Sequence, residues 1–125
     1  MSEQTIPQNC KYINIAFYKI VCNDANITDL FVGHTNDVHR RNETQLMECT
    51  NMRCNAYNTP INQFIRNNGG WDNFKLVVID HVSCHTLLEV LQLKRIHIKT
   101  QNANLNSVVP SRKKTNNGQW ITWNM

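Results

Sequence analysis

Runs of hydrophobic positions predict three strands along the chain. Residues 11–22 and 30–35 are rich in β-branched and aromatic side chains, and the turn-forming stretch between them predicts that they form a hairpin. Residues 71–80 end in a segment that is almost entirely apolar at its centre. Such a segment is typical of a strand buried on both faces, so we expect the third strand to be buried on both faces.

The first helix is expected over residues 35–49, although its apolar face is thin. Thr35 or Asn36 can cap its N-terminus, since short polar side chains accept hydrogen bonds from the first free backbone N–H groups. Asp37 then falls in the first turn, where a negative charge is favourable.

A second helix is indicated more clearly over residues 59–70. Thr59 can serve as its cap, Pro60 suits the first helical position, and Gly69 ends it. A third helix is expected from about residue 83 to residue 99, and a tail rich in polar residues follows it.

The last helix has a charged residue within its apolar stripe. Leu87, Leu91 and Ile98 lie along one line of the helical surface, and Lys94 lies on the same line. A lysine at such a position is compatible with a buried aliphatic stem and an ammonium group that reaches water.

The order of these elements predicts an α+β fold. It consists of a small central antiparallel three-stranded sheet flanked by helices, similar to an α/β sandwich. We expect an N-terminal arm over residues 1–11, one domain over residues 12–106, and a basic, tryptophan-containing tail over residues 107–125.

Length and composition narrow the class of protein. The chain has 125 residues, which suits one domain with one core. No apolar run approaches the ~18 residues of a membrane span, and no secretory signal is recognisable, so an intracellular location is expected. The net charge of +4 permits contact with nucleic acid without requiring it.

The cysteines favour free thiols over disulfides or a metal site. Their number, five, is odd, and an intracellular protein keeps its thiols reduced. Cys49 and Cys54 lie close together, but no second pair of cysteine or histidine residues follows at the spacing of a zinc site. We therefore expect no metal bound by cysteine.

Five short segments, in order and at natural spacing, carry a resemblance. They are FYKI at 17–20, FVGHT at 31–35, the basic helix that follows it, INQFIRNNGGWDNF at 61–74, and LN at 105–106. Together they resemble the GIY-YIG nuclease domain over residues 12–106. The segment NNGGWDNF and the abundance of asparagine resemble those of family members from large DNA viruses.

The resemblance implies the fold and a set of site positions. Members of the family are described as DNA endonucleases that use a metal ion such as Mg²⁺, held by a helix glutamate. Position by position, Tyr18 matches the first tyrosine and Arg41 the arginine. The altered or closing positions are Phe31 for the second tyrosine, Gln45 for a frequent histidine, Lys94 for the metal-binding glutamate, and Asn106 for the closing asparagine.

A lysine at position 94 cannot bind the metal ion. Mg²⁺ requires oxygen ligands, and a protonated ammonium group has no lone pair to offer. Glu89 does not replace the missing acid, because it matches a different family glutamate and lies about 140° away around the helix. We therefore expect a vestigial site without metal, cofactor or cleavage activity.

Three functions remain open at this point. A structural or interaction module, for example a virion or minor capsid component, is slightly favoured, with Trp120 and Trp123 as interface anchors. The second is nucleic-acid binding through Arg41, Lys94 and the tail residues Arg112, Lys113 and Lys114. The alternative is an active Mg²⁺-dependent endonuclease in which Asp37 or Asp80 supplies the acid. The expected location is the host cell or a virus particle formed within it.

Overall fold

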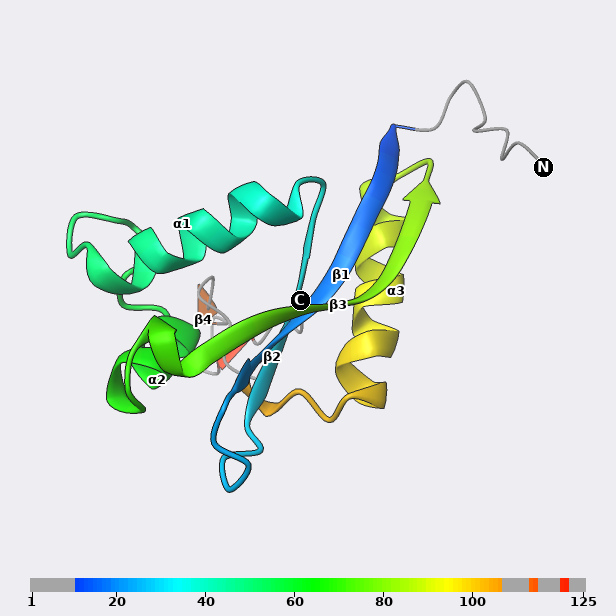
Figure 1. Ribbon diagram of the computed structural model, residues 1–125. Helices are drawn as coiled ribbons and strands as arrows, with labels where there is room; N and C mark the ends of the chain where they lie inside the picture. Colours follow the sequence, from blue (N-terminus) through cyan, green and yellow to red (C-terminus); the bar gives the residue numbers. More distant parts are fainter. Residues whose placement is uncertain (1–10, 107–112, 115–119, 122–125) are drawn as a thin grey trace.

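The computed structural model has an α+β fold, as the sequence predicts, and Figure 1 shows its arrangement. It describes residues 11–106 and the backbone of 113–114 and 120–121. Within this part, the three strands of the main sheet are β1 (Tyr12–Cys22), β2 (Leu30–Thr35) and β3 (Phe74–Cys84). The helices are α1 (Val38–Thr50), α2 (Pro60–Asn67) and α3 (Leu87–Thr100), with short 3-10 turns η1 (Trp71–Asn73) and η2 (Asn104–Asn106). Two short paired strands are β4 (Lys113–Lys114) and β5 (Trp120–Ile121).

The central strand of the sheet is β1. It pairs antiparallel with β2 on one side and with β3 on the other. Figure 1 shows α1 and α2 on one side of the sheet and α3 on the other. Two separate core clusters reflect this arrangement, one around Tyr18, Ile20 and Ile65 and one around Phe17 and Val90.

The prediction that the third strand is buried on both faces is wrong. Four consecutive residues of β1, from Ile15 to Tyr18, are buried, whereas the apolar centre of β3 is only partly covered and Val78 is 38% exposed. The reason is the strand order: β1 is covered by helices on both faces, while β3 lies at an edge. Hydrophobic content alone does not distinguish a central strand from an edge strand.

The predicted starts of the first and last helices also need correction. The α1 cap is Asp37, whose carboxylate accepts from the Arg40 N–H at 3.1 Å; Thr35 instead bonds the backbone of Asp37. The last helix begins at Leu87, because the residues up to Cys84 continue β3 and pair with β1. Its cap is Thr86.

The second helix has the predicted signals at both ends. Thr59 is at the cap position and Pro60 occupies the first turn, although the Thr59 hydroxyl bonds to the carbonyl of Ala56 rather than to the helix N-terminus. After the helix, Gly69 has a φ of 102°, which a residue without a side chain adopts most easily.

The outer edge of β2 is closed by η2. The Asn106 side chain accepts from the Val32 N–H at 2.7 Å and donates to the Val32 carbonyl at 2.8 Å, as a neighbouring strand would. Asn104 bonds the N–H of Leu30 in the same way. These contacts fix the edge strand that carries Phe31, one of the predicted site residues.

The described helices do not meet the requirements of a membrane span. None of them is both long enough and apolar enough to cross a bilayer.

Candidate functional site

Lys94 lies on the inner face of α3, one helical turn after Val90. Residues four positions apart lie on the same face of a helix, so the side chains of Val90 and Lys94 both lie against the sheet. Lys94 is only 8% exposed. Among the described residues it forms no hydrogen bond or ion pair, and its Nζ is not one of the fully buried side-chain atoms without a partner. The aliphatic stem is therefore buried while the ammonium group retains contact with solvent.

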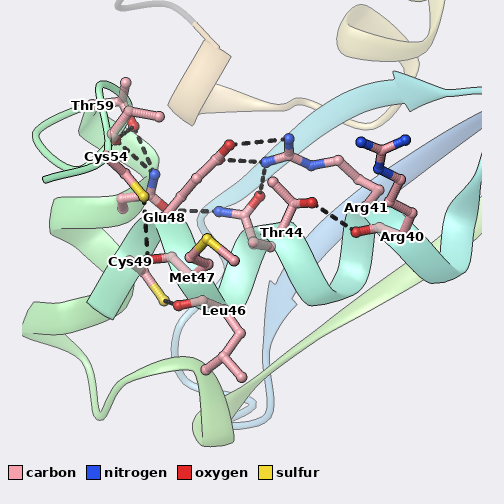
Figure 2. A network of polar contacts seen from close by, with 12 residues as sticks. Arg40, Arg41, Thr44, Leu46, Met47, Glu48, Cys49, Cys54 and Thr59 are labelled. Carbon is pink, nitrogen blue, oxygen red and sulfur yellow. Dashed lines mark hydrogen bonds and ion pairs between the residues drawn. The ribbon is translucent and has the colours of Figure 1, made fainter. Parts of the chain in front are cut away.

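Arg41 on α1 is held by two neighbours on its own helix. Its guanidinium group donates to the Glu48 carboxylate at 2.6 and 3.3 Å and to the Gln45 side-chain oxygen at 2.6 Å. Figure 2 shows the pair of Arg41 and Glu48 along the helix. The terminal nitrogens that would bind a phosphate are therefore already bonded to the protein.

The contact with Gln45 extends into a buried network that joins α1 to α2. Gln45 is 1% exposed, and its amide nitrogen donates to the Asn62 side chain at 2.6 Å. Asn62 in turn donates to the Ala56 carbonyl at 2.8 Å and to the Thr59 hydroxyl at 3.0 Å. The residue at the expected histidine position is thus a structural link between two helices.

Tyr18 lies across β2 at the one position where a strand neighbour has no side chain. It pairs with Gly33, and a Cβ added at Gly33 would collide with the tyrosine ring. Burial raises the pKa of the Tyr18 phenol, and the charge of Arg41 opposes this only in part. The phenol is therefore protonated at neutral pH and is not a base.

His34 interacts electrostatically with Lys94, although no sequence pattern selects it as a site residue. It pairs with Phe17 on β1, and the two rings lie 6.4 Å apart. Burial, helped by the charge of Lys94, lowers the pKa of His34 to about 4. The imidazole is neutral at pH 7, and its buried Nδ1 has no hydrogen-bond partner.

The charges around Lys94 do not balance. Burial and then the charge of Arg41 lower the pKa of Lys94 to about 8, so the ammonium is mostly protonated at pH 7. Burial alone would lower the pKa of Arg41, but Glu48 and Tyr18 outweigh it and the pKa is raised. Two cations and one carboxylate, with Tyr18 and His34 neutral, leave one positive charge uncompensated.

The residues present do not fit a divalent metal ion. Mg²⁺ would need hard oxygen ligands, but the position expected for the acid holds an ammonium, and the nearby Glu48 carboxylate is bonded to Arg41. In residues 11–106, no group of three or more His, Cys, Asp or Glu side chains could hold a metal ion.

The acids considered as substitutes have other contacts. Asp37 caps α1, and Asp80 on β3 lies 3.3 Å from His97 on α3. Glu89 accepts from the Thr86 hydroxyl in the first turn of α3. None of the three is among the groups that shift the pKa of Lys94.

The remaining predicted site residues divide into two sets. Phe31 packs against the core cluster around Tyr18, and Asn106 closes the β2 edge. These contacts do not place either residue to act on a ligand. The side chains of the tail, namely Arg112, Lys113, Lys114, Trp120 and Trp123, lie outside the described residues.

A pocket of about 220 Å³ opens at the start of α1. Its lining includes Arg40, Arg41 and Thr44, together with the capping Asp37. Arg41 therefore lines this pocket, and its charge also lowers the pKa of Lys94. Of the predicted site residues, a hydrogen bond joins Arg41 and Gln45, and Glu48 is added to them by its ion pair with Arg41. Electrostatic interactions link Arg41 with Tyr18 and Lys94, and Lys94 with His34.

Comparison with family models, with curated proteins and with solved structures finds no match for this chain.

Proposed function

We propose that this protein is a catalytically inactive relative of the GIY-YIG nucleases that serves as a structural or interaction module. One observation carries the inactivity: the residue at the metal-binding position is a buried, unpaired lysine. Its positive charge, next to that of Arg41, opposes the approach of a divalent cation. The resemblance to viral members makes a virion, or the host cell in which it forms, the proposed location.

Two further features of the site support the proposed inactivity. The arginine expected to stabilise charge on phosphate is bonded to Glu48 and Gln45. The tyrosine expected to assist the attacking water is buried and protonated, since burial raises its pKa. Each group would have to break existing contacts or lose a proton before it could take part in hydrolysis.

The interaction module is supported by apolar side chains that remain exposed on the described surface. Met47 and Leu46 near the end of α1 are 55% and 47% exposed, and Met52 just beyond it is 78% exposed. Exposed methionine and leucine side chains close in sequence are common at protein interfaces. Proteins of a larger assembly are the proposed partners.

Nucleic-acid binding is the second candidate, and the uncompensated charge at Lys94 favours it. A backbone phosphate would supply the missing negative charge. Such binding would weaken as the salt concentration rises, because bound phosphates release counterions.

A plasmid-nicking assay with Mg²⁺ or Mn²⁺ tests the proposed inactivity. We expect no nicking by the unmodified protein above the background of the buffer. The Lys94→Glu variant provides the matched comparison, because it restores the acid at the same position. Metal-dependent nicking by the unmodified protein would show that the proposal is wrong.

A further inference from the structure

The outer edge of β3 has no neighbouring strand within the described part of the chain. β3 is the last strand on its side of the sheet, and β1 pairs with its inner edge only (Figure 1). The opposite edge of the sheet, on β2, is instead covered by asparagine side chains of η2. An unpaired strand edge is a template for another strand, and proteins usually cover or interrupt such edges.

Two contacts at the start of β3 show which backbone groups face outward. The Asn23 N–H donates to the Asn73 carbonyl at 2.8 Å, so residues at steps of two from Asn73 bond to β1 in this register. The Phe74 N–H points the other way and donates to a carbonyl in η1. The N–H and carbonyl groups of Leu76 and Val78 therefore point away from β1, and no described residue forms a hydrogen bond with them.

This free part of the β3 edge ends on both sides. At Phe74 the N–H is already bonded within η1, although the carbonyl has no described partner. Beyond Val78 the register with β1 shifts by one residue, and the Asp80 carboxylate accepts from the His81 N–H at 2.8 Å. A bulge and an amide bonded to its neighbouring side chain both interrupt strand pairing. Residues 74–78 are therefore the segment that another strand can join.

We propose that two copies of this chain pair antiparallel through residues 74–78 and so join their three-stranded sheets into one. The free segment is centred on Leu76, and a strand edge is self-complementary about a two-fold axis. Leu76 exchanges two backbone hydrogen bonds with Leu76 of the second copy. The Val78 N–H of each copy donates to the Phe74 carbonyl of the other, so of the free outward groups only the Val78 carbonyl stays unpaired.

The side chains favour this register over the adjacent ones. A two-fold axis at Lys75 would place the two lysines directly opposite each other, and like charges that face each other are destabilising. An axis at Val77 would pair only residues 76–78, because the bulge follows, and would leave the Phe74 carbonyl unused. With the axis at Leu76, Lys75 faces Val77 of the second copy, and no like charges are opposed.

The pairing also covers apolar surface. Val78, which is 38% exposed, lies within the paired segment. The inference goes beyond the proposed function, because neither the inactivity nor the exposed apolar side chains near the end of α1 enter it. It names one partner by its chemistry: the same strand edge on a second copy.

Sedimentation of the full chain over a range of concentrations measures the association, and amide hydrogen exchange locates it. We expect a dimer, with protection of the Leu76 and Val78 amides that increases as the dimer forms. The Lys75 and Val77 amides bond to β1 and serve as internal controls that should be protected at every concentration. A chain that stays monomeric would overturn the proposal, and so would a dimer in which the Leu76 and Val78 amides exchange rapidly.

Two substitutions at one position test the register. Val77→Lys places a second positive charge opposite Lys75, and the two-fold axis repeats the repulsion, so we expect the dissociation constant to rise about tenfold. Val77→Glu is the matched control, because it places a negative charge opposite Lys75 and should bind at least as tightly as the unmodified chain. Equal weakening by both substitutions would overturn the pairing of Lys75 with Val77. If Val77→Lys does not fold, Val77→Glu and the exchange of the unmodified chain still decide.

Failure of this inference and failure of the proposed function give different results. A monomeric chain without nicking activity would overturn the dimer and leave the proposed inactivity standing. Nicking by a dimeric chain would overturn the proposed function and leave the strand pairing standing.

Discussion

At the scale of the residue, partial burial of the unpaired Lys94 ammonium lowers the free energy of unfolding by an amount that can be measured. Burial and the charge of Arg41 lower the pKa of Lys94 in the folded chain to about 8, from an ordinary value of 10.5. Between these values the unfolded chain holds more protons, so raising the pH stabilises the folded state. At about 1.4 kcal/mol per pKa unit, the difference is on the order of 3 kcal/mol.

We therefore expect the free energy of unfolding to rise with pH in the unmodified protein relative to Lys94→Met. The rise should occur between about pH 8 and about pH 10.5 and amount to roughly 2–3 kcal/mol. Urea denaturation across this range measures it, and using the difference removes the titration of Tyr18 and other shared groups. Lys99→Met, which changes an exposed lysine, should follow the unmodified protein. Parallel curves for the unmodified protein and Lys94→Met would contradict the burial of a charged Lys94.

Gln45 gives a second prediction at this scale. Replacing Gln45 by Leu removes its bonds to Arg41 and Asn62 and leaves the buried Asn62 oxygen without its donor. We expect a loss of about 2–4 kcal/mol in the free energy of unfolding, because an unsatisfied buried polar group is costly. Asn42→Ala, an exposed change on the same helix, should stay within about 0.5 kcal/mol. A loss no larger than that of the control would contradict the structural role of the network.

At the scale of the element, β2 depends on contacts at both of its edges. One edge pairs with β1, and the other is bonded by Asn106 and Asn104 of η2. Exposed strand edges tend to recruit other chains, and this asparagine pair covers part of the β2 edge.

Replacing Asn106 by Ala should lower the free energy of unfolding by about 2–3 kcal/mol, because the Val32 N–H and carbonyl lose their partners in a buried place. Hydrogen exchange should show reduced protection of the Val32 amide. Asn104→Ala is the matched control, and its more exposed bonds should make the effect smaller. If exchange at Val32 is unchanged in Asn106→Ala, then Asn106 does not hold this edge.

The crossing of Tyr18 over β2 gives a prediction about Gly33. A methyl group at position 33 would meet the Tyr18 ring, so we expect Gly33→Ala to cost about 1–3 kcal/mol in stability. Tyr18→Phe should not relieve this loss, since the ring carbons also lie in contact. Tyr18→Leu combined with Gly33→Ala should recover part of it in thermal unfolding. Additive losses in the double variant would show that the ring does not lie over Gly33.

At the scale of the whole molecule, the sequence predicts best what depends on local signals. The limits of β2 and the start of α2 follow from a β-branched run and from Pro60 after Thr59. The burial of β3 depends on which strand lies in the centre of the sheet, and this order is a property of pairing that no single segment reveals.

The candidate site also contains residues that local signals in the sequence can predict and residues that they cannot. Glu48 lies seven residues after Arg41, two turns along one helical face, so helical periodicity could have found it. His34 could not be found in this way, because its position depends on its pairing with Phe17 and on the approach of α3 to the sheet. A resemblance to a known family indicates only the positions that have a role in that family. It therefore does not indicate His34, which has no matching role.

The central claim is that the site of this protein repels a divalent cation. The most direct measurement is the paramagnetic broadening of ¹³C signals from Lys94, His34 and Arg41 as Mn²⁺ is added to the full chain, beside the Lys94→Glu variant. We predict no selective broadening at these residues in the unmodified protein and clear broadening in the variant, because a carboxylate oxygen then replaces the ammonium. Selective, saturable broadening around Lys94 in the unmodified protein would contradict the account.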